Sequence, residues 1–202
     1  MADLSLYLLG PPRVKLDEAT IEVKPRKALA LLIYLAVTAE PHSRDSLATL
    51  LWPESDQRLA RRALSNRLSE LKETLGGDWI DAGHQTIGLR PGYWLDVDAF
   101  QDALAVEAAN PQILSEAAAI YLDDFLSGFT LPDCPEYDAW QYFQTESLHQ
   151  ALGMALDSLV GMLSERGDSE TAVPHARRRL ALDPLHEPAC RQLMRLYAWS
   201  GQ

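Results

Sequence analysis

The spacing of apolar residues along the chain changes once, near Asp98. Before this point, short apolar runs bounded by Gly, Pro and Asp alternate with longer segments of helical spacing. After it, the apolar residues keep a helical spacing as far as the C-terminus. The 202 residues are enough for two domains. We therefore expect a mainly α protein with a small β component, divided into a mixed domain over residues 1–97 and an all-α domain over 98–202.

The order of elements predicted for residues 1–97 is that of a winged helix. Three short runs predict strands: "LSLYLLG", "RVKLD" and "TIEV". Three helices follow, over Ala28–Val37, in "SRDSLATLLW" and from Asp56 to Gly77. The strand-like residues after them flank turns at Gly83–His84 and Arg90–Gly92. Three strands, three helices and a hairpin describe a winged helix-turn-helix. In that fold the third helix enters the major groove of DNA and the hairpin touches the neighbouring backbone.

The third predicted helix combines an apolar stripe with positive charge. Its apolar residues fall three or four positions apart: Ala60, Leu64, Leu68, Leu71 and Leu75. Between Arg58 and Lys72 lie five Lys and Arg residues and one acidic residue, Glu70, although the whole chain has a formal net charge of −11. A charge run is most often a solvated face. DNA contact is favoured here because the first arginines lack acidic residues four positions away. They also alternate with Ser and Asn, which bond phosphates and base edges.

This pattern assigns two kinds of DNA contact to the helix and a further set to the hairpin. The residues expected to face the groove are Arg61, Arg62, Ser65, Asn66 and Ser69. The expected contacts to the DNA backbone are Arg58, Arg67 and Lys72, and the expected wing contacts are His84 and Arg90. Because Arg61 and Arg62 point about 100° apart on a helix, we expect one to read bases and the other to bind a phosphate.

Five helical segments are predicted for the second domain, and the third of them is long, from about Glu136 to Arg166. Pro174 in the fourth segment means that this helix either begins near Val173 or has a kinked first turn. Gly167 and Gly201, each at the end of a helix, are 34 residues apart, which is the period of tetratricopeptide repeats. A tetratricopeptide-like helical domain is therefore expected.

The acidic residues are concentrated in the second domain. Residues 1–100 contain 12 Lys and Arg against 14 Asp and Glu, whereas residues 101–202 contain 6 against 15. The first half can bind DNA through a local basic face despite a whole-chain pI near 4.8, and the acidic half is expected to contact proteins. One basic run in the acidic half, Arg177–Arg179, is interpreted as charge near a helix C-terminus, which the helix dipole favours. A partner or nucleic-acid contact is the alternative.

No enzyme, cofactor or metal site is predicted. The sequence contains no phosphate-binding glycine loop, no dinucleotide-binding glycine motif and no H-E-x-x-H zinc motif. The two cysteines form no C-x-x-C pair, and His186 with Cys190 lacks a second pair of ligands. The N-terminus has no basic signal-peptide region, and no apolar stretch reaches transmembrane length. We expect a cytoplasmic protein without membrane contact.

Six segments of the chain carry a family resemblance. In the first domain they are "KPRKALALLIYLA", "SRDSLATLLWP" and "LSNRLSELKETLG", and in the second they are "YLDDFLSGF", "EYDAWQ" and "RRRLALDPLHEPACRQLMRLYAWSGQ". Together they resemble the bacterial antibiotic regulatory proteins called SARPs, which join an OmpR-type winged helix to a bacterial transcriptional activator domain. Where the family's recognition helix has a V-S-R-L-R pattern, this chain has Glu70 in place of the first arginine. The family has a further helix after the "SG" ending, so the chain resembles a truncated piece of a longer protein or a short member.

The resemblance implies a sequence-specific, DNA-binding transcriptional activator. Its implied partners are double-stranded promoter DNA, RNA polymerase and a second copy of the chain in a homodimer. RNA polymerase is expected to touch the turn made by Trp52, Pro53 and Glu54. The alternative is a helical-repeat interaction scaffold whose winged helix no longer binds DNA, and Glu70 and the acidic balance motivate it.

Overall fold

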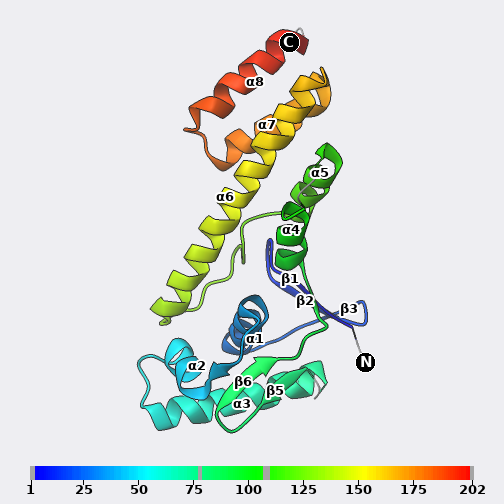
Figure 1. Cartoon of the computed structure of the whole chain (residues 1–202). Helices are drawn as coiled ribbons and strands as arrows, with labels where there is room; N and C mark the ends of the chain where they lie inside the picture. The colour runs from blue at the N-terminus through cyan, green and yellow to red at the C-terminus, as the bar shows by residue number, and fades with distance from the viewer. Residues whose placement is uncertain (1–2, 77–78, 107–109, 201–202) are drawn as a thin grey trace. The chain divides into compact units, whose positions relative to one another are not determined.

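The computed structural model describes residues 3–76, 79–106 and 110–200 (Figure 1). The chain forms two compact units. Unit 1 consists of Met1–Val97 and Phe125–Phe143, and unit 2 consists of Asp98–Asp124 and Gln144–Gln202. Helices dominate and the sheets are small, which confirms the predicted fold class of a winged helix followed by an all-α domain.

Unit 1 contains a four-stranded sheet in the order β3-β2-β1-β7. Its strands are β1 (Leu4–Tyr7), β2 (Arg13–Leu16), β3 (Ala19–Ile21) and β7 (Trp94–Leu95). The first three pair antiparallel and confirm the three predicted strands, whereas β7 pairs parallel with β1. Alternate residues of β1, Leu4 and Leu6, are buried, as expected for a strand with one face on a core.

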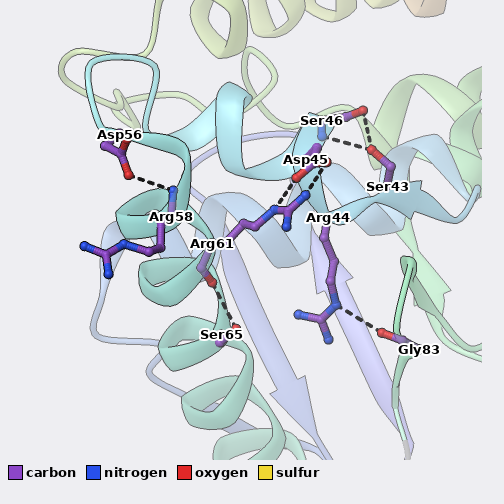
Figure 2. Close-up of polar contacts among 9 residues, drawn as sticks. All are labelled: Ser43, Arg44, Asp45, Ser46, Asp56, Arg58, Arg61, Ser65 and Gly83. Carbon is purple, nitrogen blue, oxygen red and sulfur yellow. Dashed lines mark hydrogen bonds and ion pairs between the residues drawn. The ribbon is translucent and has the colours of Figure 1, made fainter.

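Three helices of unit 1 form the helix-turn-helix and its support: α1 (Arg26–Thr38), α2 (Arg44–Leu51) and α3 (Gln57–Leu75). The side chain of Ser43 accepts a hydrogen bond from the Ser46 backbone and caps α2, and Asp56 caps α3 through the Arg58 backbone N–H (Figure 2). All five residues of the predicted apolar stripe of α3 are buried. The other side of this helix is therefore left to solvent.

The hairpin of unit 1 is made by β5 (Ile80–Ala82) and β6 (Thr86–Leu89), which pair antiparallel with Ile80 opposite Leu89. It confirms the predicted wing. A third short strand, β4 (His42–Ser43), pairs with β6 and joins the hairpin to the start of α2. Two residues are too few to show a strand period, so β4 could not be predicted from its sequence.

Residues 125–143, which belong by position to the predicted second domain, pack into unit 1. The Leu126 N–H donates to the Leu8 carbonyl at 2.8 Å. The Trp140 ring lies edge-on to the rings of Tyr34 and Phe125, with centroids 5.0 and 5.8 Å away. The compact unit is therefore discontinuous in sequence, a feature that a single cut between residues 97 and 98 does not describe.

The helices outside the winged helix are α4 (Asp96–Leu104), α5 (Pro111–Ile120), α6 (Pro135–Glu165), α7 (Ser169–Leu182) and α8 (Glu187–Ser200). The long predicted helix is confirmed by α6. Helix α7 begins at Ser169 and includes Pro174, so the expected start near Val173 is wrong. The Asp168 side chain caps this helix by accepting a hydrogen bond from the Thr171 N–H, and Ala172 and Val173 are buried. Gly201 lies outside the described residues, so the 34-residue repeat stays a prediction.

The three consecutive arginines of α7 are all engaged within unit 2. Arg178 donates to the carbonyls of Ala118 and Tyr121 at the C-terminal end of α5, with 2.6 Å to Ala118. Arg179 Nε bonds Asp157 at 3.0 Å, and Arg177 Nε donates to the Tyr197 hydroxyl at 2.6 Å. The three arginines thus make contacts within unit 2. Arg178 donates to backbone carbonyls at the C-terminal end of the neighbouring helix α5 instead of those of α7.

Candidate nucleic-acid interface

One face of α3 carries most of the residues predicted to bind DNA. Six of them are exposed on the side opposite the buried stripe: Arg58, Arg61, Arg62, Ser65, Asn66 and Ser69. Arg67 and Lys72 are half-buried. The helix therefore brings six predicted contacts onto one exposed surface, although the charges around them differ.

Arg61 is held by an acidic residue of α2. Its Nε and Nη2 donate to the two carboxylate oxygens of Asp45, with 2.6 Å between Nη2 and Oδ2 (Figure 2). This hydrogen bond lowers the pKa of Asp45 and raises that of Arg61, so both groups stay ionised. Asp45 was not predicted as a partner of Arg61, because it lies on another helix, 16 residues earlier in the chain.

Arg67 is also paired, in this case within α3. Its Nη1 lies 2.9 Å from a carboxylate oxygen of Glu70, three residues further along the helix. Glu70 is the residue that stands where the family pattern has an arginine. The substitution therefore neutralises a neighbouring positive charge in addition to removing one.

Arg58, Arg62 and Lys72 differ from these two, because within the described ranges their side chains make no ion pair or hydrogen bond. Arg58 and Arg62 are exposed near the N-terminal end of α3. Lys72 lies in the last turn, where the helix dipole favours a cation. The uncompensated positive charge of α3 thus comes from three residues.

A hollow of about 470 Å³ lies beside this surface, between the start of α2, α3 and the turn of the hairpin. Its lining is polar and consists of Ser43, Arg44, Asp45, Arg61, Ser65, His84 and Gln85. Arg44 Nε donates to the Gly83 carbonyl at 3.0 Å and ties the hairpin turn to α2 (Figure 2). Arg44 was not among the predicted residues, because nothing in the sequence places it near a turn 39 residues away.

The two residues predicted for the wing lie at opposite ends of β6. His84 is exposed in the turn before the strand and lines the hollow. Arg90 follows the strand, and its backbone N–H donates to the Trp79 carbonyl at 2.9 Å. Of these two residues, only His84 lies next to the exposed surface of α3.

The hydroxyl groups of two predicted contacts are bonded to the helix itself. Ser65 Oγ donates to the Arg61 carbonyl at 2.9 Å, and Ser69 Oγ donates to the Ser65 carbonyl at 3.2 Å. Each hydroxyl retains its acceptor lone pairs. Donation to a phosphate would require rotation of the side chain.

The turn expected to meet RNA polymerase connects α2 to α3. Trp52 is half-buried, with Lys27 Nζ 5.2 Å from the centre of its ring. Pro53 is half-buried and Glu54 is exposed. The Ser55 N–H donates to the Trp52 carbonyl at 3.1 Å and closes the turn.

In the part of the chain that the structure describes, no three His, Cys, Asp or Glu side chains are grouped so that they could hold a metal ion. Across the described ranges, no helix is both long and apolar enough to cross a membrane.

A winged helix with a charged third helix, joined to a helical domain, defines the architecture of a transcriptional regulator. Residues 95–202 match the family described as Bacterial transcriptional activator domain. The match covers more than half of the chain, which therefore belongs to this family of transcriptional regulators. The finding confirms the resemblance to the SARPs.

Two curated transcriptional regulatory proteins are similar to this chain and support the same family. Over 200 residues the chain is 24% identical to Transcriptional regulatory protein MoaR1 of Mycobacterium tuberculosis, covering 93% of this chain and 64% of the relative. It is 32% identical over 95 residues to Transcriptional regulatory protein EmbR of Mycobacterium bovis, covering 46% of this chain and 24% of the relative. The chain thus spans less than two thirds of the length of each.

A solved structure shares the fold. Mycobacterium tuberculosis EmbR in complex with a low affinity phosphopeptide aligns with a TM-score of 0.78 and 21% identity, covering 100% of this chain and 56% of that one. At this identity the similarity concerns the fold alone.

Proposed function

We propose that this protein is a sequence-specific DNA-binding transcriptional regulator that activates promoters by recruiting RNA polymerase. The observation that carries the proposal is the exposed face of α3, where Arg58 and Arg62 have no ion-pair partner in the described ranges. On the same helix, Arg61 and Ser65 line a hollow together with His84 of the hairpin turn. A helix in this position of a winged helix-turn-helix enters the major groove, and the hairpin follows the adjacent backbone. The polar hollow between them supplies further hydrogen-bonding groups at the same surface.

The charges on this face divide the proposed contacts. Arg58, Arg62 and Lys72 carry uncompensated charge and bind phosphates, which releases counterions and supplies affinity for any sequence. Ser65, Asn66 and Ser69 are exposed along the same helix and reach base edges or sugars. Because Glu70 neutralises Arg67, Arg67 contributes less to phosphate binding than its position on the helix predicts.

RNA polymerase and a second copy of the chain are the proposed protein partners. Residues 1–97 read promoter DNA. The turn at Trp52–Glu54 and residues 98–202 contact RNA polymerase and a second copy of the chain. Membership of the Bacterial transcriptional activator domain family supports this division. The net charge of the second half, with 6 basic against 15 acidic residues, also favours protein contacts over DNA contacts there.

The test begins with selection of bound duplexes from a random DNA pool by the full chain. The selected duplex and a scrambled one are then titrated at several salt concentrations. Arg58→Ala and Arg62→Ala should each weaken both duplexes alike and reduce the salt slope by about one, because each removes one phosphate contact. The matched control is Lys24→Ala, which removes an exposed charge outside α2, α3 and the hairpin and should leave the slope unchanged. Unchanged affinity in both arginine variants, with the fold intact, would refute DNA binding by α3.

A second function, that of an interaction scaffold whose winged helix no longer binds DNA, is favoured by one observation. Two of the arginines on α3, Arg61 and Arg67, are neutralised by Asp45 and Glu70. The two functions differ in one measurement. A regulator binds DNA with an affinity that falls steeply with salt, whereas a scaffold shows no salt-dependent shift of promoter-length DNA.

A further inference from the structure

The ion pair between Asp45 and Arg61 leaves part of the guanidinium unused. The guanidinium has five N–H donors, of which one on Nε and one on Nη2 point to the carboxylate. The other N–H of Nη2 and both of Nη1 bond nothing in the described part of the chain. These remaining donors include the parallel pair at the end of the side chain, the pair with which arginine forms bidentate contacts.

The pair has no net charge, which separates Arg61 from its neighbour Arg62. Because Asp45 is ionised, its negative charge offsets that of the guanidinium it holds. Affinity for phosphates arises from net positive charge that displaces counterions. Arg61 therefore offers directed hydrogen-bond donors with little of the charge that drives non-specific binding, whereas Arg62 offers uncompensated charge.

Asp45 is well placed to hold the guanidinium in one orientation. It lies in the first turn of α2, two residues after the Ser43 cap, where the helix dipole favours an anion. Figure 2 shows the side chains of Asp45 and Arg61 pointing toward each other from α2 and α3. Both line the polar hollow with Ser65 and His84, at the surface proposed to face DNA. The orientation of Arg61 is thus set by a neighbouring helix of the same helix-turn-helix.

We propose that Asp45 is a positioning residue that holds Arg61 to read a base edge, namely the O6 and N7 acceptors of guanine, instead of a phosphate. The parallel N–H pair at the end of arginine matches these two acceptors in the major groove. Arg62, one residue further along, binds the phosphate backbone. The inference rests on the proposed DNA binding by α3 and assigns the roles of two adjacent arginines.

The test uses variants of the full chain that separate specificity from charge. The double variant Asp45→Asn with Arg61→Gln removes the pair while keeping its net charge at zero. Affinity for the selected duplex should fall roughly 5- to 150-fold. Affinity for a scrambled duplex and the salt slope should not change. Asp45→Asn alone frees a positive charge, so it should raise affinity for the scrambled duplex, steepen the salt slope by about one and lower the ratio of selected to scrambled affinity.

Two further variants guard against loss of fold and against general charge effects. Arg61→Lys keeps the charge and an ion pair with Asp45 but lacks the planar pair of donors, so it should lose discrimination without a change of slope. Glu22→Gln removes an exposed carboxylate outside α2, α3 and the hairpin that has no arginine partner in the described ranges, and it should leave the affinity ratio unchanged.

The outcomes distinguish this inference from the proposed function. If the wild-type chain selects no sequence, the proposed function fails and the inference fails with it. If it selects a sequence but the double variant weakens selected and scrambled duplexes equally, or flattens the salt slope, Arg61 is a phosphate contact and only the inference is wrong. If Asp45→Asn lowers affinity for both duplexes by the same factor, Asp45 has a structural role and the inference is again wrong.

Discussion

At the scale of single residues, Asp96 shows how one buried carboxylate joins distant parts of unit 1. It is 4% exposed, and its oxygens accept hydrogen bonds of 2.7–2.9 Å from the backbone N–H groups of Leu8 and Leu9. Burial raises the pKa of this carboxyl, and the backbone N–H groups oppose the rise. These bonds give acceptors to the two N–H groups that follow β1, and the carboxylate that supplies them directly follows β7.

Replacing Asp96 should therefore destabilise unit 1. Asp96→Ala leaves two buried N–H groups without acceptors, and we expect the free energy of unfolding to fall by about 3 kcal/mol. Asp96→Asn keeps one acceptor oxygen and should lose less. Chemical denaturation of the full chain, followed by tryptophan fluorescence, measures both. Asp81→Ala, at an exposed position of the hairpin, serves as the control and should change stability by no more than about 0.5 kcal/mol. Equal stability of Asp96→Ala and the control would refute the role given to these bonds.

At the scale of elements, one helix of unit 2, α5, has its C-terminal end bonded by a side chain from another helix. The carbonyl groups at the C-terminus of α5 have no partners within that helix, and Arg178 of α7 supplies donors to two of them. Arg178 is half-buried, and burial lowers its pKa, but the guanidinium stays charged at neutral pH. The contact joins α5 to α7 across 57 to 60 positions of the sequence.

Arg178→Met keeps much of the side-chain volume but removes both donors. We expect the free energy of unfolding of unit 2 to fall by about 2 kcal/mol, because charge-assisted hydrogen bonds to backbone carbonyls are lost at a partly buried site. Hydrogen exchange of the amides in α5 should rise at the same time. Arg191→Met breaks an exposed i,i+4 pair with Glu187 and should cost at most about 0.5 kcal/mol. A cost as small for Arg178→Met would show that α5 does not need this cap.

At the scale of the whole molecule, unit 1 draws residues from both halves of the sequence. Phe125, Leu131 and Tyr137 are buried in the segment that returns to it, and Cys134 Sγ donates to the Leu51 carbonyl at 3.2 Å. A fragment that stops at Val97 lacks all of these contacts. The winged helix is therefore expected to be incomplete without residues from beyond the hairpin.

Two fragments test this expectation. Residues 1–143 should fold, whereas residues 1–97 should be destabilised by more than about 5 kcal/mol and remain largely unfolded, because several large buried side chains are missing. Circular dichroism melting curves and the dispersion of amide proton shifts measure the difference. The expectation is wrong if the shorter fragment melts cooperatively at the same temperature as the longer one.

How far the sequence predicted the candidate site depends on the range of each interaction. The apolar stripe of α3 was predicted because its period is a property of neighbours on one helix, and the same period placed Arg62 and Ser65 on the exposed side. The neutralised state of Arg61 was not predicted, because Asp45 lies on another helix, 16 residues earlier. Arg44 was missed for the same reason.

The sequence by itself determined which segments become helices and strands, apart from the two-residue strand β4, since propensity, caps and apolar period act over a few residues. It also determined where positive charge lies on α3 and the approximate extent of α6. Only the tertiary structure decided the parallel pairing of β7 with β1, the return of residues 125–143 to unit 1 and the partner of Arg61. These features join residues far apart in the chain. The packing of the whole unit decides which distant groups meet, and a local pattern does not record the outcome.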